Sequence, residues 1–437
     1  MSLLTFKGGI HPTCCKEFSK DSKIKIIEPP DFIYLYLSQH TGIPSKPVLE
    51  KGAEVEIGQK VAKAAGKLSV GLHSPVNGTY MGTVMYPHPL GGMKEAIRIQ
   101  VNKENSTPFK EKERAKISNI PKQKLINIIK DNGIVGMGGA AFPTYFKLQV
   151  PSSKKIKDLI INGVECEPFL TSDYRLMMEK CEEVMKGVDI VRRIINPENV
   201  WIAIEANKLD AFEVMKSTSS LFPWANFALL KTKYPQGSEK QLIDAITGRK
   251  VPEGGLPFDV NAYVQNVGTA FAIYEAVYLG KPLFERVVTV TGNVRHQSNF
   301  LVPIGTPFEY LIKLTEGPIG KISKIINGGP LMGIAQSQIS SCVVKGTSGI
   351  VVQNETETLK KEPSPCIRCA ACVDCCPMNL LPTEMYKHIE MNRLEKAKEM
   401  GVLSCMECGS CSYACPANIP LTQQFKIAKS RITKKVN

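Results

Sequence analysis

Hydrophobic and polar positions change their spacing along the chain, and these changes predict several domains. Between residues 31 and 104, short apolar runs are broken by Gly and Pro, as in V-E-I-G-Q-K-V-A-K, which predicts a small all-β unit. From residue 122, helical spacing alternates with β-rich apolar runs, which predicts a mainly parallel sheet covered by helices. A polar stretch, N-E-T-E-T-L-K-K-E-P-S-P, then leads into a cysteine-rich C-terminal region.

The alternating region is expected to supply a set of strands and helices whose order follows the chain. Strands are predicted at 158–162, 201–207 and 227–234, and helices at 122–131, 176–195, 209–219, 238–247 and 268–279. The lightly charged run 260–280 is, as a whole, typical of a buried helix. A second strand-rich unit begins at 286–292 and includes 325–330, and an amphipathic helix is expected at 383–400.

Length and composition place the chain among globular proteins of two to four domains. It has 437 residues, of which 43% are hydrophobic and 22% charged, which excludes a disordered or fibrous protein. No run approaches the ~18 consecutive apolar residues of a membrane span, and the N-terminus lacks the apolar core of a signal peptide. We therefore expect a protein on the cytosolic side.

The net charge of +14 is spread along the chain. No basic stripe interleaved with aromatic residues appears, so nucleic-acid binding is not expected. A basic surface suits anionic lipid or an acidic electron-carrier protein.

Nine of the 14 cysteines lie between Cys366 and Cys415. They form C-I-R-C-A-A-C-V-D-C-C-P and C-M-E-C-G-S-C-S-Y-A-C-P, two copies of C-x2-C-x2-C-x3-C-P that lie 39 residues apart (405 − 366). This spacing is typical of 4Fe–4S clusters, whereas zinc, the alternative, uses pairs of C-x2-C separated by a longer loop.

The fourth cysteine of each motif ligates the other cluster in two-cluster ferredoxins. The predicted ligands are Cys366, Cys369, Cys372 and Cys415 for one cluster, and Cys405, Cys408, Cys411 and Cys376 for the other. Cys375 could replace Cys376, but the spacing favours Cys376. The remaining cysteines, Cys14, Cys15, Cys166, Cys181 and Cys342, are expected to be inert apart from Cys166, whose neighbours are polar.

A glycine-rich loop spans residues 131–147 and contains Gly136, Gly138, Gly139 and Lys147. Its G-M-G-G-A-A matches the loose G-x-G-x-x-A dinucleotide pattern, but it follows a helix and contains Pro143, which argues against a Rossmann site. Its glycines let backbone N–H groups approach a phosphate, and Lys147 adds a positive charge. A purely structural turn is the alternative.

Two polar segments, N-G-V-E-C-E-P (162–168) and Y-P-Q-G-S-E-K-Q-L (234–242), follow expected strands, and V-Q-N-V-G-T-A (264–270) is a similar polar segment. The carboxyl ends of parallel strands face the ligand crevice. A single Glu in such a place is usually a solvated or capping residue. Three polar segments at corresponding ends predict a nucleotide site.

These segments resemble a known family. The runs G-M-G-G-A-A-F-P-T-x-x-K, N-G-V-E-C-E-P and G-S-E-K-Q-L are similar to the flavin- and NADH-binding subunit of respiratory complex I. The P-V-N-G-T turn is similar to the return turn of lipoyl carrier domains, although no carrier-lysine signature is present, so Lys63 and Lys67 are expected to be surface lysines. With the opening F-K-G-G-I-H-P and the two cluster motifs, the chain resembles the RnfC family of the Rnf complex, the ion-translocating ferredoxin:NAD oxidoreductase.

The resemblance implies a multidomain α/β protein. Its parts are an N-terminal extension (1–30), a barrel-sandwich hybrid (31–104), a complex-I-type FMN/NADH-binding α/β domain (105–285), a β-grasp SLBB domain (286–355) and a helical two-cluster ferredoxin-type domain (356–437).

The resemblance also implies roles for individual residues. The FMN phosphate and ribityl would lie against Gly136, Gly138, Gly139 and Lys147, and the flavin near Asn162, Glu165, Gly237, Ser238 and Asn266. Phe142 would stack on the nicotinamide nucleotide, with Glu167 and Glu239 bonding to it. The chain departs from complex I at Val164, Ser238, Ala141 and Tyr145, which places the detailed flavin contacts in question.

The function implied is an NAD(H)-reactive subunit of an ion-transporting ferredoxin:NAD+ oxidoreductase, a translocase. Electrons would pass between NAD(H), FMN and two 4Fe–4S clusters, ferredoxin would react through a partner subunit, and membrane subunits would move Na+ or H+. The chain would be peripheral on the cytoplasmic face of the cell membrane. The alternatives are a cobalamin reductase of the propanediol-utilisation type and a non-catalytic iron–sulfur protein that binds nucleic acid.

Overall fold

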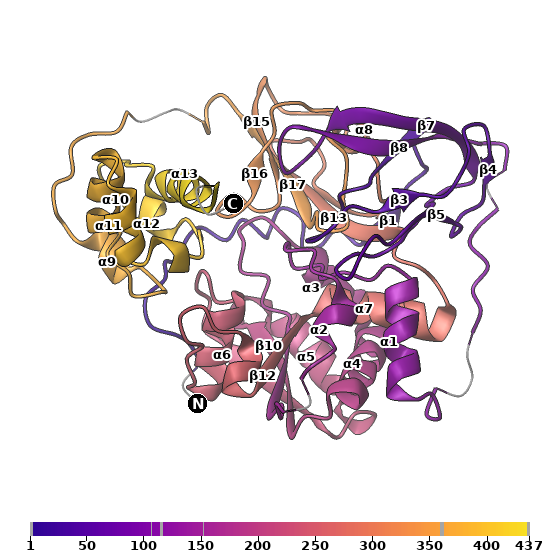
Figure 1. Ribbon diagram of the computed structural model, residues 1–437, viewed down its shortest axis with the longest axis horizontal. Coiled ribbons are helices and arrows are strands. Elements are labelled where there is room, and N and C mark those ends of the chain that lie inside the picture. The colour runs from indigo at the N-terminus through magenta and orange to yellow at the C-terminus, as the bar shows by residue number, and fades with distance from the viewer. Residues whose placement is uncertain (1–2, 106, 114–116, 152, 359–361, 435–437) are drawn as a thin grey trace.

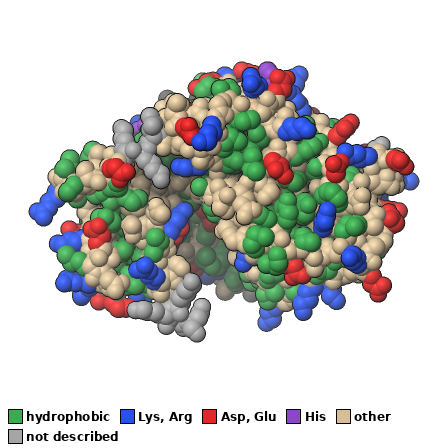
Figure 2. Space-filling model, turned by 90° about the horizontal axis from the view of Figure 1, so that it is seen from above, with side chains coloured by type: hydrophobic (Ala, Val, Ile, Leu, Met, Phe, Trp, Pro, Cys, Tyr) green, Lys and Arg blue, Asp and Glu red, His purple; other side chains and the backbone are tan. Residues whose placement is uncertain are grey.

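The computed structural model describes residues 3–105, 107–113, 117–151, 153–358 and 362–434. Its elements form two β units, one parallel α/β layer and a separate group of helices at the C-terminus (Figure 1). No helix within these described ranges is long and apolar enough to cross a membrane. On the face shown in Figure 2, Lys and Arg side chains are scattered and do not form one stripe.

The unit predicted to be all-β consists of two small sheets. The first has the order β2-β8-β7-β4 and the second β3-β5-β6. Its strands are β2 Phe32–Tyr36, β3 Lys46–Pro47, β4 Glu54–Val55, β5 Lys60–Lys63, β6 Leu72–His73, β7 Gly78–Pro87 and β8 Met93–Val101. Inward-facing residues such as Ile33, Leu35 and Ile97 are buried between the sheets, as the alternating pattern requires.

The α/β layer carries a four-stranded parallel sheet of order β11-β10-β9-β12. The strands are β9 Asp158–Asn162, β10 Asn199–Glu205, β11 Ala225–Leu230 and β12 Ala262–Asn266. The helices are α1 Lys122–Asp131, α2 Thr144–Lys147, α3 Ser172–Glu179, α4 Cys181–Ile195, α5 Leu209–Ser217, α6 Glu239–Thr247 and α7 Val267–Tyr274. Helices α4 and α7 cross closely because Gly187 lacks a Cβ, which would lie 1.8 Å from the Ala270 carbonyl oxygen.

Three helix predictions need correction. The run 260–280 is not one helix: it holds strand β12, helix α7 and a π-helical turn at Glu275–Leu279. The helix expected at 176–195 is broken at Lys180, where φ is −136°. The helix expected at 383–400 is two helices, α10 Pro382–Glu390 and α11 Leu394–Glu399, separated at Met391–Arg393.

A six-stranded sheet of order β1-β14-β13-β17-β15-β16 forms the next unit. Its strands are β1 Ile24–Ile26, β13 Glu285–Gly292, β14 Ser298–Pro303, β15 Ile322–Asn327, β16 Ile334–Ala335 and β17 Gly349–Asn354, with helix α8 at Phe308–Leu314. The N-terminal segment ties the units together, because β1 pairs with β14 while Leu4 and Ile10 bridge to Leu230 and Tyr234 beside the parallel sheet.

The C-terminal helices repeat with the 39-residue offset of the cysteine motifs. Helix α9 Ala371–Asp374 corresponds to α12 Ser410–Tyr413, and α10 begins 39 residues before α13 Leu421–Lys434. The backbone repeats as well, since left-handed φ values occur at the matched pairs Arg368/Glu407, Ala370/Gly409 and Asn379/Asn418. Two copies of one loop–helix unit therefore hold the eight motif cysteines.

Candidate functional site

The polar segments that follow the parallel strands meet at one edge of the sheet. Asn162 ends β9, and its amide Nδ2 donates to the Gly237 carbonyl, in the segment after β11, at 2.8 Å. Asn266 ends β12, and its Oδ1 accepts from the Thr269 N–H at 3.1 Å, which caps α7. This edge brings Asn162, Gly237 and Asn266 together, as the strand order predicts.

The glycine-rich loop lies over this edge with its backbone held in place. The Gly136 N–H donates to the Phe142 carbonyl at 2.8 Å, and the Met137 N–H donates to Thr269 Oγ1 at 2.8 Å. A Cβ at Gly138 would lie 3.6 Å from that of Asn266. At Gly139, φ is +105° and nothing described lies within 4 Å of where a Cβ would sit. The loop thus presents fixed backbone to open space, as a phosphate cradle requires.

A cation and an aromatic ring stand beside the loop. Lys147 Nζ donates to Glu239 Oε1 at 2.5 Å and to the Val264 carbonyl at 2.8 Å, and both side chains of the pair are about one-third exposed. The half-buried Phe142 ring lies 5.9 Å, centroid to centroid, from Phe146, which is 44% exposed. The charge needed for an anion and a ring suited to stacking are therefore both at the loop.

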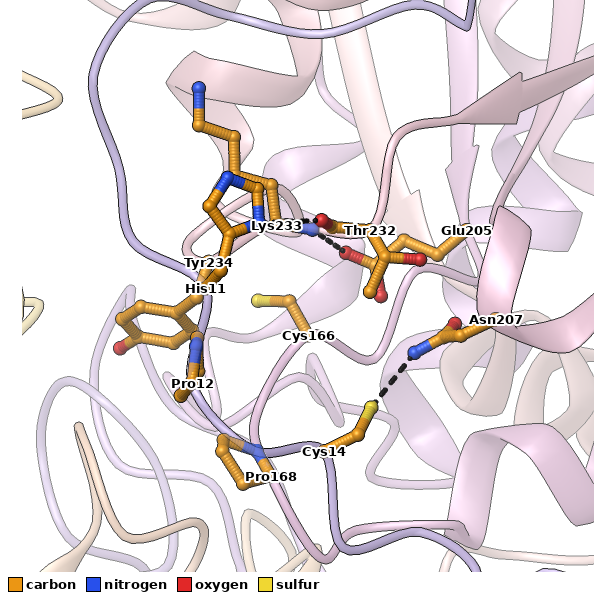
Figure 3. Close-up of a pocket in the computed structure, with 10 residues that line it drawn as sticks. All are labelled: His11, Pro12, Cys14, Cys166, Pro168, Glu205, Asn207, Thr232, Lys233 and Tyr234. Carbon is orange, nitrogen blue, oxygen red and sulfur yellow. Dashed lines mark hydrogen bonds between the residues drawn. The ribbon is translucent and has the colours of Figure 1, made fainter.

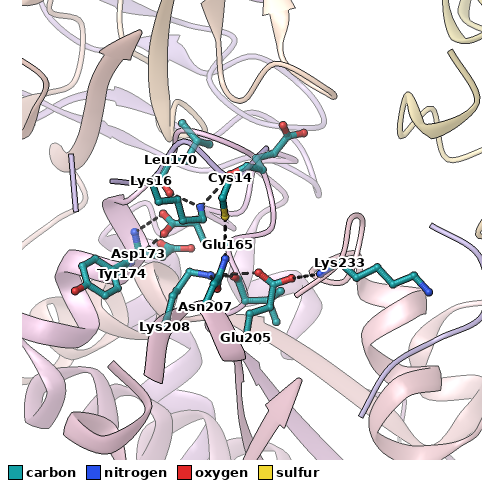
Figure 4. Close-up of polar contacts among 12 residues, drawn as sticks. Cys14, Lys16, Glu165, Leu170, Asp173, Tyr174, Glu205, Asn207, Lys208 and Lys233 are labelled. Carbon is teal, nitrogen blue, oxygen red and sulfur yellow. Dashed lines mark hydrogen bonds and ion pairs between the residues drawn. The ribbon is translucent and has the colours of Figure 1, made fainter. Parts of the chain in front are cut away.

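Glu165 holds the start of helix α3 beside the site. With φ at 44°, its carboxylate accepts from the backbone N–H groups of Asp173 at 2.8 Å and Tyr174 at 3.2 Å, at the start of α3 (Figure 4). Asp173 in turn accepts from Asn266 Nδ2 at 2.6 Å. Burial, and then the nearby Glu165 carboxylate, raise the pKa of Asp173 to about 7. No feature of the sequence separates Asp173 from an ordinary acidic residue in a first helical turn.

Glu167 and Ser238 lie on the side of the edge that faces the C-terminal helices. The Glu167 carboxylate accepts from the N–H groups of Leu331 at 3.1 Å and Met332 at 2.8 Å, and from the Tyr234 hydroxyl at 3.2 Å. Ser238 Oγ lies 3.9 Å from the Met406 sulfur. Glu167 would have to release these donors to bind a nucleotide, whereas Glu239 stays at the loop beside Lys147.

Two buried lysines hold the segment 162–171 in its conformation (Figure 4). Lys16 Nζ donates to the carbonyls of Glu167 at 3.0 Å and Leu170 at 2.6 Å, and burial lowers the pKa of this amine. Lys208 Nζ donates to the Val164 carbonyl at 2.7 Å and to Glu205 at 3.3 Å. Sequence reasoning missed both, because their partners lie far along the chain or are backbone atoms.

Cys166 borders a cavity of about 50 Å³, shown in Figure 3 with Cys14, Glu205 and Tyr234. A Cβ at Gly237 would lie 3.2 Å from the Cys166 sulfur, so the glycine allows this packing. Burial, and then Glu205, raise the pKa of the Cys166 thiol well above its usual range. The thiol therefore stays protonated and packs as a small apolar side chain.

The motif cysteines associate across the two repeats. Burial raises the pKa of the Cys372 thiol, and Cys415 and Cys366 nearby raise it further. Burial raises the pKa of Cys405 to about 11, with Cys408 and Cys376 adding to the effect. Cys415 thus lies near the first loop and Cys376 near the second, as expected if the fourth cysteine of each motif ligates the other cluster. Cys375 lies next to Cys376, and its sulfur is 3.5 Å from the Cys372 carbonyl oxygen.

The eight motif cysteines match the number of thiolates that two 4Fe–4S clusters need. Within the described ranges, no group of three or more His, Cys, Asp or Glu side chains is arranged to hold one metal ion. A 4Fe–4S cube needs four thiolates spread around a larger body, and four cysteines stand available for each cluster. The residues with left-handed φ between the cysteines turn the backbone, so that the loop can curve around one corner of a cluster.

The two cysteine loops differ in their surroundings. At the first two matched positions Cys366 and Cys369 are exposed, whereas Cys405 is half-buried and Cys408 is buried; the third cysteines, Cys372 and Cys411, are both buried. The carbonyl of Cys408 accepts from the Tyr234 hydroxyl at 2.7 Å, and the Met406 sulfur lies 3.9 Å from Ser238 Oγ. The loop 405–411 therefore lies against the edge that carries the glycine-rich loop, and the loop 366–372 lies outside. Sequence reasoning included Tyr234 at the start of the segment 234–242 but assigned it no role.

Comparison with known proteins decides the family. The chain is 40% identical to the C subunit of the proton-translocating ferredoxin:NAD+ oxidoreductase complex of Clostridium ljungdahlii, covering 91% of this chain and 87% of the relative. It is 37% identical to the C subunit of the Na+-translocating complex of Acetobacterium woodii, covering 90% and 89%. The chain belongs to the RnfC family. The RnfC relative from the ion-translocating oxidoreductase complex of Rhodobacter capsulatus matches at 38% identity over 99% of this chain and 84% of the relative.

Four domain families match in chain order. They are the RnfC barrel-sandwich hybrid domain over 4–104, the Nuo51 FMN-binding domain over 129–275, the SLBB domain over 287–335 and the 4Fe–4S dicluster domain over 358–416. The resemblance to the RnfC family and the predicted fold class are thereby confirmed. A solved NAD+-reducing [NiFe]-hydrogenase in the H2-reduced state aligns with a TM-score of 0.49 and 17% identity, over 71% of this chain and 60% of that one, which is too weak for comparing sites.

Proposed function

We propose that the glycine-rich loop and the strand ends beside it bind FMN and NAD(H). The observation that carries the proposal is the open space at Gly139, next to Lys147 and at the same sheet edge as Asn162 and Asn266. Backbone N–H groups of the loop and the Lys147 cation would hold the phosphate. Phe142 and Glu239 would contact the nicotinamide nucleotide, and Glu165 would position the loop through Asp173 and Asn266.

The chain is an electron-transfer subunit of a ferredoxin:NAD+ oxidoreductase complex that translocates ions, and it uses FMN and two 4Fe–4S clusters. When bound, FMN supplies the exchange between a two-electron hydride and one-electron carriers. The residues of the site orient the nicotinamide against the flavin and exclude water. No side chain has to exchange a proton with the nucleotide.

We assign an order to the clusters from their surroundings. The cluster held by Cys405, Cys408, Cys411 and Cys376 would exchange electrons with the flavin, because its loop contacts Tyr234 and Ser238. The cluster held by Cys366, Cys369, Cys372 and Cys415 would exchange electrons with a partner subunit, because its loop is exposed.

The complex to which the subunit belongs is a membrane complex. We place the chain at its periphery, on the cytoplasmic face, because NAD(H) and ferredoxin are soluble reactants of the cytoplasm. The relatives are named for proton or Na+ translocation, and membrane subunits would carry that step. Neither cobalamin reduction nor nucleic-acid binding receives support.

An anaerobic NADH titration of the purified chain tests the proposal. Flavin identified as FMN after extraction, bleaching of its absorbance and reduced-cluster EPR signals are expected together. Two clusters without flavin, even after incubation with FMN, would remove the assignment of the glycine-rich loop.

A further inference from the structure

A large groove lies on the side of β1, away from the cysteine loops. It has a volume of about 990 Å³. Its walls come from β1 and β14, from helices α3, α4 and α7, and from the tip of the barrel-sandwich unit. Figure 1 shows β1, α3 and α7 next to one another. Apolar side chains, including Ile26, Leu176, Phe271 and Leu301, line it.

The groove is acidic in a basic protein. Its described lining includes seven glutamates and three lysines, a balance of 3 − 7 = −4, although the whole chain carries +14. Each of the three lysines is already in an ion pair: Lys103 with Asp31, Lys180 with Glu183, and Lys281 with Glu275 and Glu285. The groove therefore keeps an excess of negative charge.

Three exposed glutamates stand out at this lining. Glu28, Glu111 and Glu113 are exposed and form no ion pair within the described ranges, whereas the other four glutamates of the lining are ion-paired. Their side chains can therefore pair with a visiting cation without breaking an existing salt bridge. The raised pKa of Tyr274 agrees with this charge, because burial and the neighbouring Glu183 and Glu111 all disfavour its phenolate.

The strand that borders the groove is the three-residue edge strand of its sheet, and one of its two outward backbone donors is already bonded to Glu179. Among the described residues β1 pairs with β14 alone. The Ile24 N–H faces the groove side, where it donates to the Glu179 carboxylate at 3.0 Å. Because backbone groups of alternate strand residues point the same way, the N–H of Ile26 belongs to this same edge. The Ile26 side chain is 84% exposed. An exposed apolar edge strand is a template for a further strand.

We propose that this groove binds a Lys/Arg-rich extended segment of a membrane subunit of the same complex, which adds to β1 as an edge strand. The proposal rests on the proposed function, in which the chain is peripheral on the cytoplasmic face. Cytoplasmic segments next to membrane spans carry an excess of Lys and Arg. Such a segment complements the glutamates, and its apolar side chains fill the floor of the groove.

Charge reversal in the intact complex tests the electrostatic part. Glu28→Lys and Glu111→Lys, together, should lower the amount of membrane subunits that co-purify with the tagged chain at least about fivefold at 0.15 M salt. Glu213→Lys, an exposed glutamate on α5, is the matched control and should leave the yield unchanged. Equal yields from the double variant and the control would overturn the proposal.

A photo-crosslinker tests the occupant. Benzoylphenylalanine at Ile26 in the assembled complex should give an adduct that maps to a Lys/Arg-rich segment of a membrane subunit. The same probe at Leu221, which is 61% exposed, should not. Adducts to a second copy of this chain or to a soluble subunit, or no adduct, would overturn the proposal. FMN content and NADH oxidation of the isolated chain are measured in parallel, because they report on the proposed function and should not change.

Discussion

The two cysteine loops have the same spacing and the same backbone turns but differ in their surroundings at the first two cysteines. In the loop 366–372, Cys366 and Cys369 are exposed and Ile367 is 68% exposed. In the loop 405–411, Cys405 is half-buried and Cys408 is buried, and the Cys408 carbonyl accepts from Tyr234. The cysteine motif thus determines that each loop binds a cluster. The residues packed around each loop determine the partner with which that cluster can exchange electrons.

Contacts made by one loop alone produce this difference. Lys429 Nζ lies 2.7 Å from Glu407 Oε1 and 2.8 Å from the Cys405 carbonyl. Arg368 occupies the position of the first repeat that matches Glu407, so the acid and its ion pair are absent there. The loop 405–411, called the inner loop, is therefore fixed on two sides, by Tyr234 and by Lys429. The loop 366–372 is called the outer loop, and the clusters assigned to the two loops are called the inner and the outer cluster.

Removing the flavin should abolish the functional difference between the loops. Gly139→Val places a branched side chain in the open space at φ +105°, and we expect loss of FMN and of cluster reduction by NADH, with dithionite still reducing both clusters. Gly91→Val is the control, since Gly91 also has a positive φ of +101° and open space but lies in the turn between β7 and β8, outside the site. Retention of FMN by Gly139→Val would contradict the phosphate cradle.

We expect the free energy of unfolding to depend on pH through Lys345, a buried lysine that bonds to Gly133 in the glycine-rich loop. Burial lowers the pKa of Lys345 from 10.5 to about 7, and its Nζ donates to the Gly71 and Gly133 carbonyls at 3.2 and 2.6 Å. Between these pH values the unfolded state binds a proton that the folded state lacks, so folded stability rises with pH.

Chemical unfolding from pH 7 to 10 measures how the free energy of unfolding changes with pH. In Lys345→Met this slope should fall by up to about 1.4 kcal/mol per pH unit. Lys313→Met, at an exposed lysine on α8, should keep it. A wild-type slope in Lys345→Met would show that the amine is charged in the folded state. The cluster EPR signals of both variants should match those of the wild type.

Tyr234→Phe should weaken the contact that only the inner loop makes. The substitution removes a buried hydroxyl that bonds to the Cys408 carbonyl and to Glu167, and we expect a loss of about 1–3 kcal/mol in the free energy of unfolding. Tyr413→Phe, at a residue 54% exposed, should change it by less than about 0.5 kcal/mol. Equal urea midpoints for the two variants would argue against the contact.

Lys429→Met should shift one cluster and not the other. Loss of a positive charge next to Cys405 makes reduction less favourable, so the midpoint potential of the inner cluster should fall by an amount on the order of tens of millivolts. Lys426→Met, on the exposed side of the same helix, should move neither potential as far. EPR-monitored redox titration measures both, and a shift in the outer cluster alone would reverse the assignment.

The sequence predicted the elements whose signals are local. Strand β9 coincides with 158–162 because five residues, four of them buried, stand between polar turns. The run 260–280 misled because Asn266 ends β12 and also caps α7, leaving no turn between strand and helix. The break at Lys180 has no Gly or Pro to mark it.

In the site, too, local sequence signals could be read and long-range contacts could not. Asn162 could be predicted because it ends an expected strand of a parallel sheet, whereas Asn266 was named only through the family resemblance, since strand β12 was not expected. Asp173, Thr269, Tyr234 and Lys16 could not, because they act through partners distant in sequence, as when Lys16 reaches the Leu170 carbonyl. Nor could the motifs reveal which loop is buried, since they are identical in spacing.

Cluster-specific loss tests the proposed order most directly. Cys408→Ala and Cys369→Ala each remove a ligand from one cluster, and anaerobic EPR after NADH addition reports on the cluster that remains, with dithionite showing that it is intact. We predict that NADH reduces the inner cluster in Cys369→Ala as in the wild type, and that the outer cluster of Cys408→Ala stays oxidised. Rapid reduction of the outer cluster by NADH in Cys408→Ala would contradict the order.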